Sequence, residues 1–221
     1  MTKILWVAEC GSLHKGDPGL AFEMIRQAKR ANATAVKFQL GWEKHGPPPQ
    51  AARYAPMEWI PDLMAWGSYL QIGVFASIWS LEALEKAEAA GMGFYKIGHQ
   101  ATGNDELVKA IIATGKPVFM SSHDLPIDAA FAENVKLIYA SSEYPTYRPA
   151  VPKEFRGWYG YSSHSHGTGD KLLAVARGAK YVEAHFCLDH ELVTRDASFA
   201  LEPPEFLEMT IAGREIERFL Q

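Results

Sequence analysis

Short apolar runs recur along the whole chain, and most of them end in a polar residue or a glycine. A longer stretch rich in alanine, leucine, glutamate and lysine usually follows, with apolar residues spaced as on one face of a helix. Short apolar runs bounded by turn residues are typical of buried β-strands. The runs cover residues 4–9, 35–39, 72–77, 94–98, 117–121, 136–141, 157–162 and 181–186.

The stretches between these runs predict helices. Pro18 and Pro203 stand where the first turn of a helix tolerates a proline, and Gly91, Gly115 and Gly178 stand where a helix would stop. The expected helices cover residues 18–31, 57–69, 81–90, 105–114, 126–133, 169–177 and 203–219, with a short and poor one near 152–155.

Strict alternation of strands and helices predicts an α/β protein with a parallel sheet. Eight strand–helix units are also the number that closes a TIM barrel, so we predict a (β/α)8 barrel of near-minimal length, as a single domain over residues 1–221. A doubly wound open sheet is the alternative. The one long irregular stretch, residues 41–56, contains three consecutive prolines, and we expect it to cap one end of the barrel as a loop.

Polar residues occupy inward positions near the ends of the expected strands. Because strands of a closed barrel are buried on both faces, a lone charged residue there costs several kcal/mol unless it is paired or functional. Alternation along the strands places Glu9, Lys37, Gln39, Lys96, Glu183 and His185 at such positions. Two interpretations stay open: a functional site at one end of the barrel, or mutual ion pairs that plug it.

The composition is that of an ordinary globular protein, with 48% hydrophobic and 22% charged residues. A formal net charge of −4 gives no basic field for nucleic acid or an anionic membrane, and no apolar run approaches the ~20 residues that span a bilayer. The chain reaches a carboxylate at Glu9, too early for the core of a signal peptide. We therefore expect a cytoplasmic protein in which Cys10 and Cys187 are reduced, buried thiols.

Histidines gather at the ends of the expected strands, where barrel enzymes keep their chemistry. The histidines in or just after a strand end are His14, His99, His123, His164, His166 and His185. His164 and His185 end neighbouring strands. Two neutral imidazoles with Glu9 nearby and open coordination positions would form a catalytic site for a divalent metal.

Lysines and hydroxyls make a second group at the same strand ends. Ammonium groups and hydroxyl donors can neutralise a phosphate or a carboxylate. The group comprises Lys37 and Lys96 with Ser77, Ser121, Ser141, Ser142 and Ser162. Because serines are also common where loops begin, the two lysines carry this prediction.

Several short strings at the strand ends become specific when they are taken together in chain order. They include Ala8-Glu9-Cys10-Gly11, Val36-Lys37-Phe38-Gln39, Tyr95-Lys96-Ile97, Gly115-Lys116-Pro117-Val118, Ser142-Glu143-Tyr144-Pro145-Thr146, Gly160-Tyr161-Ser162-Ser163-His164, Glu183-Ala184-His185-Phe186 and Leu201-Glu202-Pro203. In this order they resemble the sialic-acid synthase family, which makes N-acetylneuraminate, pseudaminate and related nonulosonates. The resemblance covers nearly the whole chain but not the family's C-terminal antifreeze-like domain, so we expect the catalytic barrel alone.

The resemblance implies a metal-dependent condensation of phosphoenolpyruvate with an N-acetylated amino sugar of the mannosamine type, with release of phosphate. It implies a divalent metal, Mn²⁺ or Mg²⁺, on His164 and His185, and it makes Glu9 a group that handles a proton or positions water. Lys37 and Lys96 would bind phosphoenolpyruvate. Further substrate contacts are implied at Gln39, Ser77, Ser121, Ser142, Ser162, Glu183 and Asp196. A homodimer is plausible by the same analogy.

Some positions depart from the family's pattern. They are Leu13 for an asparagine, His99 for a phosphate-binding serine, Ala101 for an acidic residue that helps with the sugar, Ser163 for the aspartate of Tyr-Ser-Asp-His, and Ala197 with Ala200 in the motif that begins at Asp196. These departures bear more on the sugar than on metal or phosphate binding. Two other functions therefore stay open: a metal-dependent sugar-phosphate isomerase, epimerase or aldolase, and a non-catalytic barrel that binds a ligand or a partner.

Overall fold

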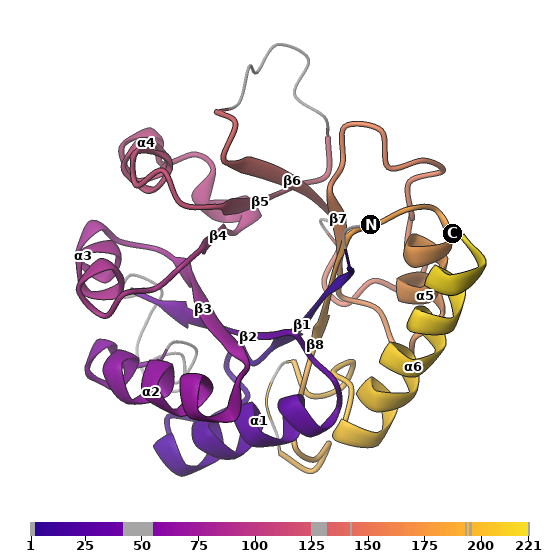
Figure 1. Cartoon of the computed structure of the whole chain (residues 1–221), viewed down its shortest axis with the longest axis horizontal. Coiled ribbons are helices and arrows are strands. Elements are labelled where there is room, and N and C mark those ends of the chain that lie inside the picture. Colours follow the sequence, from indigo (N-terminus) through magenta and orange to yellow (C-terminus); the bar gives the residue numbers. More distant parts are fainter. Residues whose placement is uncertain are drawn as a thin grey trace.

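The computed structural model describes residues 3–41, 55–124, 132–141, 143–192, 194 and 196–220. Eight parallel strands pair in chain order, and β8 pairs back onto β1, so the sheet closes into a barrel (Figure 1). The strands are β1 Leu5–Glu9, β2 Ala35–Leu40, β3 Gly73–Ile78, β4 Tyr95–Ile97, β5 Val118–Ser122, β6 Val135–Ala140, β7 Gly160–Ser163 and β8 Tyr181–His185. The predicted barrel is confirmed, and the open sheet is wrong.

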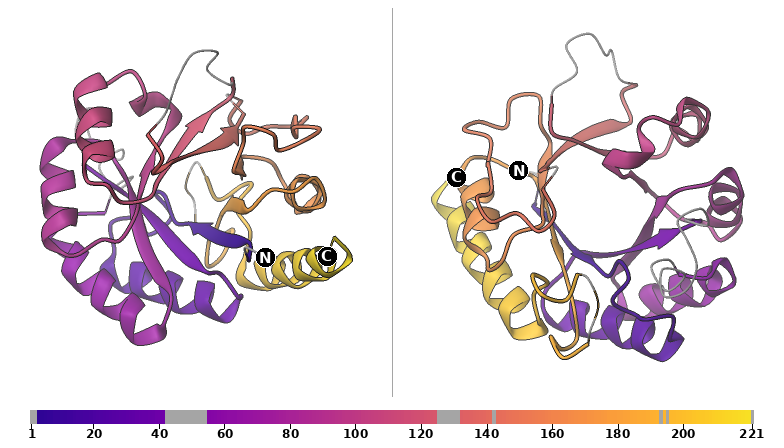
Figure 2. Two further views of the ribbon diagram at one scale, coloured as in Figure 1. Left: turned by 45° about the horizontal axis from the view of Figure 1, so that its top comes forward. Right: turned by 180° about the vertical axis from the view of Figure 1, so that it is seen from behind.

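Helices follow most of the strands and pack around the outside of the barrel (Figures 1 and 2). They are α1 Pro18–Arg30, α2 Ile60–Leu70 after the 3-10 turn η2 Met57–Trp59, α3 Leu81–Ala89, α4 Asp105–Ala113 after the 3-10 turn η3 His99–Ala101, α5 Gly169–Ala176 and α6 Pro203–Phe219. The side chain of Asp17 accepts the N–H groups of Gly19 and Leu20 at the start of α1, and Glu202 and Glu205 form a capping box at the start of α6. Both helices begin at their predicted prolines.

Three expected segments have other outcomes. Residues 42–54 of the expected capping loop and 126–131 of the expected helix 126–133 lie outside the described residues. The short helix expected near 152–155 is wrong, because this stretch is irregular. The Arg177 guanidinium donates hydrogen bonds to the carbonyls of Val151 and Pro152, at 2.7 and 3.3 Å. In a helical turn these carbonyls would accept from backbone N–H groups instead.

The interior of the barrel changes character along its axis. Toward the end where the strands begin, aromatic rings fill the interior, with centroids 4.5 Å apart for Phe75 and Phe94 and 4.7 Å apart for Phe119 and Tyr181. Toward the end where the strands finish, the inward-facing side chains are mostly polar or charged, among them Glu9, Lys37, Lys96 and Glu183. A functional site is therefore expected at the carboxyl ends of the strands.

The two ends of the described chain meet beside β1. The N–H of Ile4 donates to the Glu217 carboxylate at 3.1 Å, and the labelled ends lie close together in Figures 1 and 2. Trp6 packs against Gly213 of α6 so closely that a Cβ there would come within 2.3 Å of the indole. Glycine is therefore required at this crossing, and α6 seals the seam between the first and last strands.

The state of the two cysteines and the character of the helices bear on what the composition led us to expect. Cys10 and Cys187 are both free and buried, as predicted. In the described part of the chain, no helix combines the length and the apolar character needed to cross a membrane.

Candidate functional site

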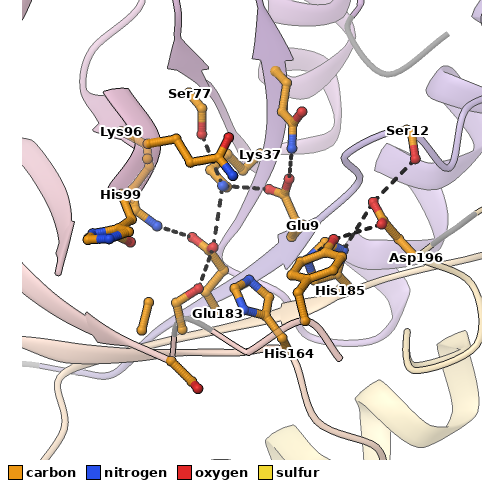
Figure 3. Close-up of a pocket in the computed structure, with 18 of the residues that line it drawn as sticks. Glu9, Ser12, Lys37, Ser77, Lys96, His99, His164, Glu183, His185 and Asp196 are labelled. Carbon is orange, nitrogen blue, oxygen red and sulfur yellow. Dashed lines mark hydrogen bonds and ion pairs between the residues drawn. The ribbon is translucent and has the colours of Figure 1, made fainter. Parts of the chain in front are cut away.

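A pocket of about 290 Å³ opens at the carboxyl ends of the strands (Figure 3). Every strand contributes to its wall. The predicted site residues found there are Glu9, Lys37, Gln39, Ser77, Lys96, Ser121, Ser162, His164, Glu183, His185 and Asp196. Ser141, one of the predicted hydroxyls, also lines the wall, whereas Ser142 lies outside the described residues. The structure thus gathers these residues at one rim, and their roles stay predictions.

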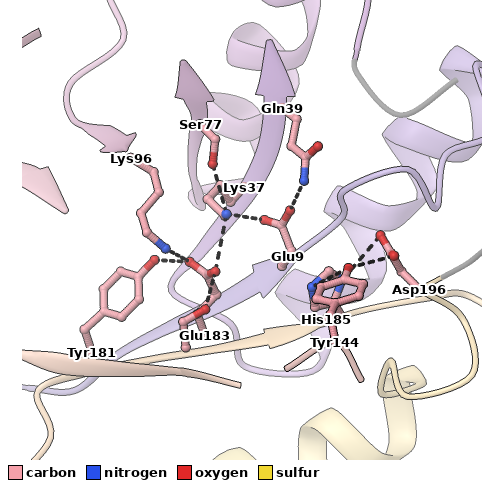
Figure 4. Close-up of polar contacts among 11 residues, drawn as sticks. Glu9, Lys37, Gln39, Ser77, Lys96, Tyr144, Tyr181, Glu183, His185 and Asp196 are labelled. Carbon is pink, nitrogen blue, oxygen red and sulfur yellow. Dashed lines mark hydrogen bonds and ion pairs between the residues drawn. The ribbon is translucent and has the colours of Figure 1, made fainter. Parts of the chain in front are cut away.

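Four charged side chains, Glu9, Lys37, Lys96 and Glu183, form what we call the floor cluster. Lys37 Nζ lies 2.8 Å from Glu9 Oε2 and 3.3 Å from Glu183 Oε1, and Lys96 Nζ lies 2.9 Å from Glu183 Oε2 (Figure 4). All four side chains are buried, and Glu9 is the register partner of Lys37 on the next strand. These residues therefore pair with one another without plugging the barrel, since they also line the pocket, and a functional role for them stays a prediction.

Burial and ion pairing shift the pKa values of Glu183, Lys37 and Lys96 in the floor cluster. Burial would raise the pKa of Glu183, but the ammonium groups of Lys37 and Lys96 bring it well below its usual value. Burial would lower the pKa of Lys37, but Glu183 and Glu9 raise it. For Lys96, burial outweighs the attraction of Glu183 and lowers the pKa to about 8. The charge of Lys96 therefore changes close to neutral pH.

The two lysines differ in how much hydrogen-bonding capacity they have left. An ammonium group has three donors. Lys37 directs its donors at Glu9, at Glu183 and at the Ser77 hydroxyl, 3.1 Å away. Lys96 has one hydrogen-bonded partner among the described residues, Glu183. Lys96 therefore retains donors for a ligand, whereas Lys37 acts mainly through its charge.

Neutral groups hold the carboxylates of the floor cluster in place. The Gln39 amide donates to Glu9 at 3.1 Å, and the Ser162 hydroxyl donates to Glu183 at 2.7 Å. The Tyr181 hydroxyl also donates to Glu183. These bonds orient the carboxylates before any ligand arrives.

His164 and His185 face each other in the same pocket, with ring centroids 5.5 Å apart. Burial first, and then the neighbouring His185, lower the pKa of His164 to about 3, so its imidazole is neutral. The Nδ1 atoms of both rings are buried and have no hydrogen-bond partner among the described residues. The nearest protein groups to the His185 nitrogens are Asp196 Oδ2, 3.8 Å from Nδ1, and the Tyr144 hydroxyl, 3.4 Å from Nε2. Imidazole nitrogens suit Mn²⁺ and related ions, so the chemistry of this pair fits the expected metal.

The rest of a metal's coordination would come from other sources. Within the described ranges, no group of three or more His, Cys, Asp or Glu side chains is placed to hold an ion. A site with two protein imidazoles would therefore leave positions for water or substrate, which is the character of a catalytic site.

Two wall residues that the sequence analysis did not single out bind Asp196. The Tyr144 hydroxyl donates to Asp196 Oδ1 at 2.7 Å, and the Ser12 hydroxyl donates to Oδ2 at 3.2 Å. The Tyr144 oxygen also lies 3.4 Å from His185 Nε2, so it links the carboxylate to the histidine pair. Tyr144 belongs to one of the matching strings, which was its only signal, and Ser12 had none. The other wall residues that were not predicted are Trp79, Gly98, Gln100 and Ala140.

Only some of the strand-end histidines reach the pocket. His99 lines it beside His164 and His185, and its ring packs against His123 with centroids 4.5 Å apart. His14 is buried beside Trp59 instead, and burial lowers its pKa to about 4. His14, His123 and His166 are outside the wall. The clustering of histidines predicted the correct end of the barrel, but not which of them face the cavity.

The departures from the family pattern fall into separate places. His99 is in the pocket wall, and Ser163 donates a hydrogen bond to Asp170 of α5 at 2.5 Å. The departures that are buried and do not line the pocket are Leu13, Ala101, Ala197 and Ala200. Only one of the departures therefore changes the pocket wall directly.

Named synthases are similar to this chain over almost all of its length. Pseudaminic acid synthase of Campylobacter jejuni is 26% identical over 258 residues, which cover 99% of this chain and 75% of that protein. N-acetylneuraminate-9-phosphate synthase of Mus musculus is 28% identical over 257 residues, which cover 97% of this chain and 70% of that protein.

A solved structure and a family pattern agree with these relatives. The crystal structure of N-acetylneuraminic acid synthetase from Leptospira borgpetersenii, in complex with citrate, matches with a TM-score of 0.84 at 24% identity, and the match covers 99% of this chain and 85% of that one. This likeness shows the barrel fold. The pattern of the NeuB family matches residues 50–221, which is more than half of the chain. The chain therefore belongs to the NeuB family.

Proposed function

We propose that this protein condenses phosphoenolpyruvate with an N-acetylated amino sugar of the mannosamine type, giving a nonulosonic acid and inorganic phosphate. The names of its relatives support a synthase of this kind. The observation that carries the proposal is one pocket that holds two buried ammonium groups and two imidazoles whose Nδ1 atoms make no hydrogen bond within the described residues. The first pair suits an anionic substrate, and the second suits a divalent metal.

Lys96 is the residue best prepared to bind the phosphate of phosphoenolpyruvate. Its ammonium group keeps donors beyond its bond to Glu183. The hydroxyls of Ser77, Ser121 and Ser162 line the same pocket and can add neutral donors. Lys37 contributes charge, because its own donors are directed at protein groups.

The reaction conserves atoms through one molecule of water. The third carbon of phosphoenolpyruvate forms a bond to the aldehyde carbon of the sugar, whose oxygen takes up a proton. Water adds to the cationic second carbon, and the bond from that carbon to the phosphate oxygen then breaks, leaving a ketone. The two protons of the water end on the new hydroxyl and on the departing phosphate.

Residues of this chain supply positioning and proton transfer for these steps. Glu9 is the candidate to take the proton of the water, because its carboxylate lines the pocket and is fixed by Lys37 and Gln39. His164 and His185 would hold a divalent metal, which supplies Lewis-acid polarisation of the aldehyde oxygen when it is bound. Tyr144 and Asp196, near His185, are available to contact the sugar.

The test is phosphate release from phosphoenolpyruvate with a panel of N-acetylated amino sugars, in the presence of Mn²⁺ or Mg²⁺. We expect release that needs a sugar and a metal and that falls in Lys96→Met. Thr210→Val is the control variant, because Thr210 binds the Ala31 carbonyl at 3.1 Å, away from the pocket. Absence of sugar-dependent release across the panel would contradict the proposal, and conversion of a sugar phosphate without phosphoenolpyruvate would favour an isomerase or aldolase.

A further inference from the structure

A second group of buried polar residues lies between β7 and α5, outside the pocket. Its members, which we call the outer network, are Tyr161, Ser163, Ser165, Asp170 and Lys171. Asp170 and Lys171 are only 8% and 1% exposed, and no member of the network lines the pocket. A buried ion pair is weak evidence for stability, since desolvation can outweigh the attraction. The outer network therefore calls for another explanation.

Asp170 is the centre of this network. Its Oδ2 accepts hydrogen bonds from the Tyr161 hydroxyl at 3.0 Å and from the Ser163 hydroxyl at 2.5 Å. Its Oδ1 lies 3.1 Å from Lys171 Nζ. Burial would raise the pKa of Asp170, but Lys171 and the Ser163 hydroxyl hold it below its usual value. The start of α5 is thus bound to β7 through a charged carboxylate.

The outer network fastens the backbone on both sides of His164. Ser163 comes directly before His164, and Ser165 comes directly after it. The Ser163 hydroxyl accepts the N–H of Ser165 at 3.2 Å, and Lys171 donates to the Ser165 carbonyl at 2.7 Å. The His164 carbonyl also accepts the N–H of Thr146 at 2.9 Å. The flanking residues are held from outside, while the imidazole of His164 lines the pocket (Figure 3).

We propose that Asp170 and Lys171 are positioning residues that hold the His164 imidazole in its orientation toward His185. The inference rests on the proposed function only in taking His164 as a metal ligand. Ser163 stands where the family motif has an aspartate, and here the carboxylate beside this position comes from α5 instead. The outer network would therefore preserve the geometry of His164 after the change on the strand.

Two measurements on metal-free and metal-titrated protein test the role. The first is the side-chain nitrogen spectrum of ¹⁵N-labelled histidine without metal, with His164 assigned by His164→Ala. The second is Mn²⁺ affinity, followed by the loss of the free-ion electron paramagnetic resonance signal. The variants are Asp170→Asn, Lys171→Met and the double variant that combines them.

Asp170→Asn leaves Lys171 buried without its counterion, so we expect a lower melting temperature and Mn²⁺ binding about 10-fold weaker. The double variant removes the unpaired charge and should regain most of the melting temperature. Its Mn²⁺ affinity should stay about 10-fold weaker, and its His164 signals should stay shifted, because the contacts around Ser165 are not restored. Should Asp170→Asn fail to fold, the double variant and Lys171→Met carry the same test.

A further variant moves the carboxylate from Asp170 on α5 to position 163 on β7. Ser163→Asp combined with Asp170→Asn returns a negative charge to the strand, beside Lys171, and we expect it to recover most of the Mn²⁺ affinity. Thr210→Val is the matched control, since it removes a buried hydrogen bond remote from β7 and should lower the melting temperature without changing Mn²⁺ binding.

The proposal is overturned if the double variant binds Mn²⁺ like the wild type and its His164 signals are unchanged, because the pair would then only support the fold. If the wild-type protein itself binds no Mn²⁺, the proposed metal fails. The His164 spectrum of the metal-free variants would still decide whether the outer network positions the ring. The two failures can therefore be told apart.

Discussion

The floor cluster and the histidine pair lie in one pocket, but they differ in how far other groups of the protein pair with them. In the floor cluster, every charged group has an opposite charge within 3.3 Å. In the histidine pair, no Nδ1 atom makes a hydrogen bond within the described residues, and the nearest charged group is the Asp196 carboxylate, 3.8 Å from His185 Nδ1. A buried charge is costly unless it is paired in the folded state, whereas a neutral imidazole can lack a partner at smaller cost. The fold itself pairs the charges of the floor cluster, whereas the histidine pair keeps hydrogen-bonding capacity that the proposed metal would use.

The largest effect is expected from breaking the histidine pair. His164→Ala or His185→Ala removes a candidate ligand, and metal-dependent phosphate release should fall about 1000-fold, since a Lewis acid contributes several kcal/mol to such a step. The melting temperature should change little, because Asp196, which lies 3.8 Å from His185 Nδ1, keeps its hydrogen bonds from Tyr144 and Ser12 when the imidazole is removed. An assay of phosphate release checks the loss of activity, and thermal melting followed by circular dichroism checks the melting temperature. Stoichiometric titration of metal into the double variant would show that the ligand assignment is wrong.

Breaking the floor cluster should act on stability instead. Glu183→Gln leaves Lys96 without its ion-pair partner, so the free energy of unfolding should fall by about 3 kcal/mol, as measured by urea denaturation. Asp196→Asn is the matched change near the histidine pair. Because the hydrogen-bonding partners Tyr144 and Ser12 are neutral, the free energy of unfolding should fall clearly less than in Glu183→Gln. Equal losses in the two variants would remove the distinction between the two regions.

The smallest expected effect comes from titrating Lys96. Its pKa of about 8 means that the free protein loses this charge as the pH rises through that value, so the affinity for phosphoenolpyruvate should weaken by up to about tenfold per pH unit above 8. The unfolded chain, with a pKa near 10.5, binds more protons between pH 8 and 10.5, so this group makes the free energy of unfolding rise with pH across that window. Calorimetric titration at several pH values checks the binding. The same steep decline in Lys96→Met would assign it to another group.

The barrel was predictable because each of its strands has a clear pattern of apolar residues in the sequence. Each is a short buried run, and the two-residue period decides which side chains point inward. The same period found Glu9, Lys37, Lys96 and Glu183, since strand register brings inward positions of neighbouring strands together. The prediction failed at 152–155, where contacts with Arg177 decide the path of the chain.

The rest of the site comes from loops and from the first turns of helices, where the two-residue period of the strands does not apply. Tyr144 and Ser12 reach Asp196 through loops whose course is set by contacts distant in the chain. Asp170 and Lys171 occupy the first turn of α5, a place typical of exposed charges, and only the packing of α5 against β7 buries them. Sequence patterns identify which residues a strand turns inward, but they do not identify which loop residues fold over the opening.

The aromatic rings of Phe75, Phe94, Phe119 and Tyr181 pack against one another at the end of the barrel opposite the pocket mouth. We therefore expect molecules to enter and leave the pocket at the carboxyl ends of the strands. In the proposed condensation, the substrate that occupies the lysines would then bind before its partner, and its phosphate would leave after the larger product. Side chains packed at the far end of the barrel would thus set the order of binding and release.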